Sequence, residues 1–373
     1  MKILLLTLEY WPEHVGGVAR YLDTLVHHWP KDDEVFVLTH TRLDLRNEGN
    51  VRWTKLVENH KFGWWKMFGQ TRDFIKQNKI DTLIISHVVP VGYIAYLQKK
   101  VYGTPYVVIL HGLDIALTTQ SWWKKFLTKI ILKNAKLIIA NSQDTISIVN
   151  RNYHMYPEIV YPALHDEKPE VNQNLVDKLK DKYDLAGKKV ILTVGRLVER
   201  KGQDKIIEAL PEVIKKIPDL KYIIVGRGEY QEHLQKIARQ LNIEDKIIFV
   251  TRAEDDELNA WYQICDIFVM VSRILNQSDR EGFGIVYLEA AYFQRPSIAG
   301  KFGGAMEAVI NGETGLLVDS HSPAEIAQAI IKLLQDDDLR KHLGEQGKMR
   351  VEREFLGSQQ SIKVRNLLLN KSK

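Results

Sequence analysis

The segment GRLVERKG, which begins at Gly195, places Arg196 and Lys201 in a turn after the apolar run KVILTV. A helical pattern begins near Gln203, so both cations are expected beside a helix N-terminus. A guanidinium fork, a compact ammonium charge and backbone N–H groups together suit a pyrophosphate. These residue types therefore predict an anion site for a diphosphate. The alternative is a basic loop that only faces water.

The segment EGFGIVYLEA, which begins at Glu281, offers two carboxylates around a turn and a helix start. Its glycines permit a tight turn, and Gly284 opens the helical run IVYLEAAYF. Seven residues separate Glu281 from Glu289, so the two carboxylates can contact one ligand at two depths. The alternative is a capped helix with two surface acids. We expect the backbone N–H groups near Phe283, Gly284 and Ile285 to point at an anion.

Short runs rich in Val, Ile and Leu alternate with helical patterns along the chain and must position these segments. Continuous apolar runs indicate strands covered on both faces, and hence a parallel sheet. Right-handed crossovers then give doubly wound α/β domains, which bind ligands at the carboxyl ends of their strands. The pattern restarts after a polar stretch at 162–187, so we expect two Rossmann-like domains, 1–165 and 166–354, with a cleft between them. The expected strands are 2–7, 34–39, 81–86, 105–110 and 136–140 in the first domain, and 189–194, 222–226, 246–250, 266–270, 296–300 and 315–319 in the second.

Composition excludes several classes of protein. The chain has 373 residues, a formal net charge of +5 and one cysteine, Cys265. A chain of this length can bury a core without disulfides, and so small a charge gives no argument for nucleic acid. The longest apolar runs have the length of strands, far below the roughly 20 residues of a membrane-spanning helix. We interpret the start, MKILLLTLEYWPE, as a buried strand rather than a signal peptide and expect a cytoplasmic location.

Five further segments complete a pattern that resembles the retaining glycosyltransferases of family 4, which have the GT-B fold. In that fold two Rossmann-like, doubly wound domains face each other across a cleft. The resemblance implies that the first domain binds the acceptor and the second the nucleotide sugar, and that a C-terminal helix, about 355–373, packs back on the first domain. The matches run in the family's order over positions 1–319: Gly16-Gly17, HGLD at 111–114, Asn141-Ser142, GRLVERKG at 195–202, VGRGE at 225–229, EGFGIVYLEA at 281–290 and NGETGLLV at 311–318.

The resemblance also implies where the donor binds. Family members use the residues that match Arg196 and Lys201 to hold the donor pyrophosphate. The residue that matches Glu281 contacts the sugar hydroxyls, and the one that matches Glu289 holds the ribose. Two cations and a helix N-terminus can stabilise a leaving nucleoside diphosphate without a divalent metal, so we expect no metal and no cofactor besides the donor. The backbone at Phe283, Gly284 and Ile285 is expected to seat phosphate and sugar, and the acidic runs at 254–257 and 336–338 to be solvated acids rather than a metal clamp.

The catalytic set implied by the resemblance consists of His111, Glu281, Arg196 and Lys201. The histidine that matches His111 lies beside the transferred sugar, and the usual mechanism is front-face attack, in which the departing phosphate takes the proton of the acceptor. Asp114 is expected either to contact the acceptor or to orient His111. The alternative for His111 is a structural role at a strand end. Gly16 and Gly17 are expected to let the first loop approach donor and acceptor.

The loop before Glu281 departs from the common family pattern. It is longer and carries Arg273 and Arg280, which resembles the mannosyltransferases that act on phosphatidylinositol mannosides. This resemblance favours GDP-mannose as donor. Ordinary variation in loop length is the alternative, and the two arginines are also candidates for contact with an anionic acceptor or a donor phosphate.

Two segments of the first half mix aromatic and cationic residues, at 61–68 and 121–133. Helices with Trp and Lys can lie on an anionic membrane surface. In the alternative, the aromatic side chains pack on the sheet and the lysines face water. We expect a lipid-linked or glycan acceptor and a peripheral position on the inner face of the cell membrane. Nucleic acid is not expected as a partner, because the basic residues are dispersed.

Other functions fit the same residues. The first is a UDP-sugar-dependent glucosyl or N-acetylglucosaminyl transferase of surface polysaccharide synthesis. The second is a nucleotide-sugar epimerase of the same fold. The third, which is not catalytic, is a nucleotide-sugar sensor or a partner subunit.

Overall fold

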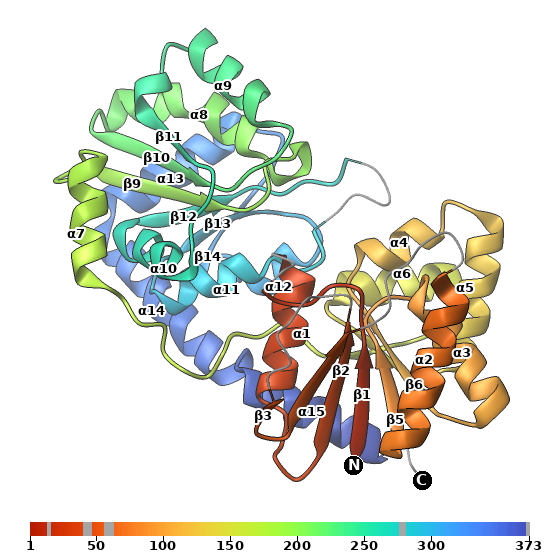
Figure 1. Cartoon of the computed structure of the whole chain (residues 1–373). Coiled ribbons are helices and arrows are strands. Elements are labelled where there is room, and N and C mark those ends of the chain that lie inside the picture. Colours follow the sequence, from red (N-terminus) through yellow and green to blue (C-terminus); the bar gives the residue numbers. More distant parts are fainter. Residues whose placement is uncertain (13–15, 40–46, 56–62, 276–280, 371–373) are drawn as a thin grey trace. The chain divides into compact units, whose positions relative to one another are not determined.

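The computed structural model describes residues 1–12, 16–39, 47–55, 63–275 and 281–370. The chain forms two compact units (Figure 1). Unit 1 consists of Met1–Asp166 together with Phe355–Lys373, and unit 2 consists of Glu167–Glu354. Each unit is an α/β domain built on one largely parallel sheet, so the predicted fold class is confirmed.

The sheet of unit 1 has the order β3-β4-β2-β1-β5-β6-β7-β8. Its central strands carry continuous apolar runs because helices cover both faces, and Leu4, Val107 and Leu83 are fully buried. The order reverses between β1 and β5, so the carboxyl ends of these strands mark the switch point at which such sheets bind ligands. The strands are β1 Lys2–Leu6, β2 Glu34–Thr39, β3 Asn47–Glu48, β4 Val51–Lys55, β5 Thr82–Ile85, β6 Tyr106–Leu110, β7 Leu137–Ala140 and β8 Glu158–Ile159, of which β3 pairs antiparallel with β4.

The helices of unit 1 include one from the far end of the chain. Helix α15 lies against α1 (Figure 1), where Val364 and Leu368 join the apolar core. The Arg365 Nε donates to Asp33 at 2.7 Å, and the Ser361 hydroxyl donates to the Leu25 carbonyl at 2.9 Å. The helices are α1 Gly17–His27, α2 Gly63–Asn78, α3 Val91–Tyr102, α4 Leu113–Thr118, α5 Trp122–Asn134, α6 Gln143–Tyr153 and α15 Gly357–Asn370.

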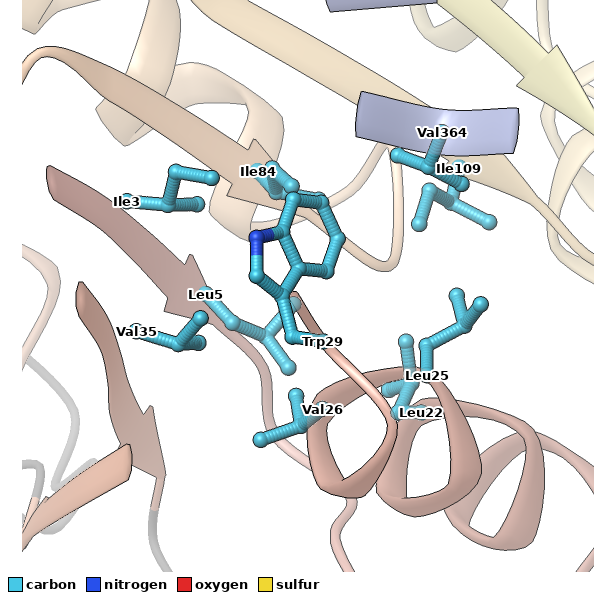
Figure 2. Close-up of a pocket in the computed structure, with 10 residues that line it drawn as sticks. All are labelled: Ile3, Leu5, Leu22, Leu25, Val26, Trp29, Val35, Ile84, Ile109 and Val364. Atoms are coloured by element: carbon cyan, nitrogen blue, oxygen red, sulfur yellow. The ribbon is translucent and has the colours of Figure 1, made fainter. Parts of the chain in front are cut away.

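A small cavity of about 20 Å³ lies in this core beside Trp29 (Figure 2). Ile109 and Val364 line one side of it, and aliphatic side chains of α1, β1, β2 and β5 line the rest together with Trp29. A space of this size holds at most one water molecule, and its lining offers no polar partner. We therefore regard it as imperfect packing under α15 rather than as a ligand site.

The sheet of unit 2 has the order β11-β10-β9-β12-β13-β14, and each neighbouring pair of strands in this order is parallel. Its order reverses between β9 and β12, which places the switch point at the ends of these two strands. The strands are β9 Lys189–Val194, β10 Leu220–Val225, β11 Ile247–Val250, β12 Ile267–Met270, β13 Ser297–Gly300 and β14 Gly315–Val318. The helices are α7 Gln173–Lys182, α8 Gln203–Lys216, α9 Gln231–Gln240, α10 Asp255–Ile264, α11 Ile285–Tyr292, α12 Ala305–Ala308, α13 Pro323–Gln335 and α14 Asp337–Glu354, with 3₁₀ turns at Glu199–Lys201 and Glu244–Lys246.

The expected strands at 2–7, 34–39 and 189–194 correspond to β1, β2 and β9. The sequence pattern missed β4, because Arg52 and Lys55 are exposed near the edge of the sheet and interrupt the apolar run. Within the described ranges, no helix combines the length and apolar character that crossing a bilayer requires.

Candidate active site

The turn that carries Lys201 connects β9 to α8 at the switch point of unit 2. The 3₁₀ turn Glu199–Lys201 ends at Gly202, whose φ of +75° favours glycine. A Cβ on Gly202 would lie 2.3 Å from the Val271 carbonyl oxygen, which follows β12. Only glycine therefore lets this turn pack so closely against the end of β12, and that packing fixes where Lys201 points.

Three side chains converge on one oxygen of Glu281. The Lys201 Nζ lies 2.5 Å from Glu281 Oε2, and the Arg200 Nη1 lies 3.1 Å from the same oxygen. The Ser272 hydroxyl donates to this oxygen at 3.1 Å. Lys201 and Arg200 are each 8% exposed, so little water screens their charges. The cluster brings a carboxylate and two cations together at the carboxyl ends of β9 and β12.

The charges in this cluster shift each other's pKa. Burial alone would raise the pKa of Glu281, but the positive charges of Lys201 and Arg200 outweigh burial and lower it to about 2. Burial lowers the pKa of Lys201; attraction to Glu281 opposes this effect, and repulsion by Arg200 and Arg196 adds to it. Glu281 is therefore ionised at neutral pH and is an acceptor for hydroxyl groups.

The structure pairs Arg200, rather than Arg196, with Glu281. Arg196 is exposed on the loop before the 3₁₀ turn, and its backbone carbonyl accepts from the Gln203 side chain at 3.2 Å. Its charge still acts on Lys201. Arg200 was not predicted, because the resemblance assigns the phosphate-binding role to the residue that matches Arg196. The signal for Arg200 was its position next to Lys201 in the same turn.

Gly284 is the N-cap of α11 and has a φ of +89°, and a Cβ there would lie 2.6 Å from the Tyr287 ring. The turn therefore requires glycine at this position. On the next turns of α11, Glu289 accepts a hydrogen bond of 2.6 Å from the Tyr262 hydroxyl. Tyr262 is a site residue that no pattern in the sequence indicates. Phe283 is buried, and Ile285 is the first residue of α11. Both residues, whose backbone N–H groups were expected to face an anion, therefore lie at the start of this helix.

Arg273 is buried with 4% exposure and is held by two acidic residues. Its guanidinium donates to both carboxylate oxygens of Asp204 at 2.8 Å and to Glu199 at 3.3 Å. Its backbone N–H donates to the Arg200 carbonyl at 2.8 Å. This geometry favours a positioning role for Arg273, which supports the turn, over the expected contact with an acceptor or phosphate. Arg280 lies outside the described residues.

In unit 1, His111 follows β6 and lies among polar groups at the sheet's carboxyl edge. Its backbone N–H donates to Asp114 Oδ1 at 2.9 Å, so Asp114 holds the chain at His111. The ring of His111 stands edge-on to Tyr21 and near His87, with centroids 5.5 Å and 5.8 Å away. Among the described residues, neither His111 Nε2 nor Asp114 Oδ2 has a hydrogen-bond partner, although both atoms are buried.

Burial shifts the pKa of both groups towards the neutral form. It lowers the pKa of His111 well below its usual value, and the nearby His87 adds to the effect. Burial likewise raises the pKa of Asp114. Two buried polar atoms without partners are costly in a folded protein, so a polar ligand that satisfied them would gain affinity.

The structure gives Gly16 and Gly17 no steric need for glycine. Gly16 has an extended φ of −176°, which any residue adopts. Among the described residues, a Cβ at either glycine would meet nothing within 4 Å. The predicted role in close approach therefore does not follow from unit 1 itself and stays a prediction about bound ligands.

Comparison with known proteins gives matches over both units. The family described as Glycosyltransferase Family 4 matches residues 15–168, and the family described as Glycosyl transferases group 1 matches residues 176–350. The chain is 27% identical to a GDP-mannose-dependent alpha-(1-6)-phosphatidylinositol monomannoside mannosyltransferase of Mycolicibacterium smegmatis, with 92% of each chain covered. It is also 27% identical to a GDP-mannose-dependent monoacylated alpha-(1-6)-phosphatidylinositol monomannoside mannosyltransferase of Corynebacterium glutamicum, covering 98% of this chain and 97% of the relative. Among solved structures, Anabaena HepE in complex with UDP and glucose has a TM-score of 0.79 at 20% identity and covers 99% of this chain and 100% of its own.

Proposed function

The chain belongs to the group 1 and family 4 glycosyltransferases, and from this premise we propose that it transfers mannose from GDP-mannose to a lipid-linked or glycan acceptor. The transfer proceeds with retention and without a metal ion. That the chain is a glycosyltransferase using a nucleotide sugar follows from the matches over both units. The choice of mannose is supported by relatives named as GDP-mannose-dependent.

The observation that carries the proposal is the cluster of Lys201, Arg200 and Glu281 at the switch point of unit 2. Glycosyl transfer develops positive charge on the sugar and negative charge on the leaving phosphate. Lys201 and Arg200, with Arg196 on the same loop, are placed to stabilise the negative charge as it forms. The Glu281 carboxylate, ionised at neutral pH, accepts hydrogen bonds from the sugar hydroxyls.

The remaining site residues have narrower roles in the proposal. Glu289, oriented by Tyr262, accepts from the ribose hydroxyls. In unit 1, His111 supplies polar contacts to the transferred sugar through its backbone carbonyl and its unpartnered ring nitrogen. Asp114 orients His111 through the hydrogen bond to its backbone.

The donor is tested by calorimetric binding of GDP, UDP, ADP and their sugar conjugates in the presence of EDTA. We expect GDP and GDP-mannose to bind at micromolar concentrations, at least tenfold more tightly than UDP or ADP. Tight binding under EDTA supports the metal-independent site, because Lys201, Arg200 and Arg196 then balance the pyrophosphate charge without a metal ion. Preference for UDP would replace mannose by glucosyl or N-acetylglucosaminyl transfer. Absence of binding by any nucleotide contradicts the assignment of this site.

We also propose that unit 1 contacts an anionic membrane surface through α5. Trp122 is 83% exposed and Phe126 is 60% exposed. These two aromatic side chains therefore do not pack on the sheet, which was the alternative to membrane contact. The helix instead buries Thr128, Ile131 and Leu132. Its exposed aromatics, with lysines along the same helix, are typical of helices that lie in a membrane interface. In α2, Trp64 and Trp65 are also exposed and stack on each other, while the expected residues Lys61 and Phe62 lie outside the described residues.

The membrane proposal predicts that the protein sediments with vesicles rich in anionic lipid at low salt. Replacing Trp122 and Phe126 together by alanine is expected to weaken binding by roughly tenfold or more, because two large apolar side chains lose their burial. Tyr156→Ala is the matched control, since Tyr156 is 78% exposed in the same unit but lies outside α2 and α5. Equal recovery of wild type in the supernatant with and without vesicles would contradict the proposal.

A further inference from the structure

Three histidines of unit 1 meet where α1 ends. His27 and His28 close α1, and His165 comes from the segment that follows β8. One ring nitrogen of each histidine and a carboxylate oxygen of Glu167 all lie within 4.8 Å of one another. The ring centroids are 4.9 Å to 5.3 Å apart. No part of the donor site requires these residues, and they lie in the other unit.

We propose that His27, His28 and His165 bind a divalent transition-metal ion, with zinc as the best fit. Neutral imidazole nitrogens are preferred ligands of zinc and similar ions. His28 Nε2 and His165 Nδ1 are 3.2 Å apart. Two nitrogens that bind one tetrahedral zinc ion at about 2.0–2.1 Å lie about 3.3 Å from each other. The observed separation fits two ligands of one ion.

The groups around the histidines support this assignment. A histidine that binds a metal through one nitrogen usually donates its other N–H to a carboxylate or a neighbouring oxygen. The other nitrogen of His28, Nδ1, faces Asp166 at 3.7 Å. The other nitrogen of His165, Nε2, faces Asp23 at 3.5 Å and the Thr24 hydroxyl at 3.4 Å. Both carboxylates can thus fix the ring orientation in which the remaining nitrogens point at a common ion.

The alternative is a network of neutral histidines without a metal. In that case the ring contact between His28 and His165 is a hydrogen bond, and the Asp166 backbone N–H also donates to His28 Nε2 at 3.2 Å. Metal binding would replace these weak contacts by coordination and hold the segment around His165 on α1. Since unit 2 begins at Glu167, the ion would anchor the chain on unit 1 just before it leaves that unit.

The test is zinc titration of the full-length protein without a histidine tag, followed by calorimetry. We expect one zinc ion per chain with micromolar or tighter affinity and a raised melting temperature. Bound Co²⁺ should show the visible absorption of tetrahedral nitrogen ligation. His28→Ala and His165→Ala should each weaken binding at least tenfold, and Asp23→Asn should weaken it less because Asp23 only orients a ligand.

His154→Ala serves as the control, because it removes a histidine of the same unit that lies outside the cluster. Circular dichroism establishes that each variant is folded. If wild type binds no zinc, the proposal fails. It also fails if His28→Ala and His165→Ala, both folded, bind zinc as wild type does, since the ion then lies elsewhere. Donor binding in EDTA is measured separately, so failure of the metal site leaves the proposed glycosyl transfer unaffected.

Discussion

Lys201→Ala is expected to lower kcat/KM for sugar transfer by at least a hundredfold while the protein stays folded. Lys201 is 8% exposed and points at the oxygen of Glu281 that also receives Arg200 and Ser272. In the proposed reaction its ammonium group stabilises the leaving diphosphate, and the loss of one such electrostatic contact typically costs a factor of about 10² to 10³. Glu281 keeps two partners in the variant, so its carboxylate is not left buried and unpaired.

The effect is measured with GDP-mannose as donor, together with thermal unfolding. Lys205→Ala is the matched control, because Lys205 lies one turn along α8 and pairs with Glu208 instead. We expect the control to transfer sugar at a rate close to that of wild type. Glu281→Gln keeps the shape of the side chain but removes its charge, and we expect it to lose activity as well. A rate near that of wild type in Lys201→Ala would remove this lysine from the mechanism.

The sequence predicted the strands of the fold better than the side-chain contacts of the site. The strands with continuous apolar runs, such as 105–110 and 222–226, were predicted because burial on both faces leaves a plain pattern. Strand β4 was missed because the exposed side chains of Arg52 and Lys55 interrupt its apolar run. Helix α7 was missed because it lies in the polar stretch at 162–187, which reads as a linker.

In the site, features that depend on neighbouring residues could be predicted, whereas contacts between distant segments could not. The turns at Gly202 and Gly284 could be predicted because each contains a glycine. In the structure both glycines have a positive φ angle. The partners of Glu281 could not be chosen from the sequence, because Ser272 and Arg200 reach it only through the packing of β12 against the β9 turn. The same limit applies to Tyr262, which reaches Glu289 across 27 positions. Contacts of this kind depend on topology rather than on spacing.

The second large effect is expected on stability, for Arg273→Ala. Arg273 and Asp204 are both buried, with 4% exposure each, and are joined by two hydrogen bonds of 2.8 Å. Removing the guanidinium leaves the Asp204 carboxylate buried without its partner. Breaking a buried pair in this way typically costs about 3–5 kcal/mol in the free energy of unfolding. Replacing both residues, as Arg273→Met with Asp204→Leu, is expected to cost less, because no buried charge is then left unpaired.

The measurement is urea unfolding of the full chain, followed by hydrogen exchange of peptides from each unit. We expect the midpoint for peptides of unit 2 to fall by roughly 1–3 M urea in Arg273→Ala, and that of unit 1 to stay unchanged. Arg252→Ala is the control, because Arg252 and its partner Glu254 are exposed and such pairs contribute at most about 1 kcal/mol. A shift no larger than that of the control would show that the buried pair does not stabilise unit 2. Since the Arg273 guanidinium also bonds Glu199, which lies in the same turn as Lys201, a true loss of the pair should reduce sugar transfer as well as stability.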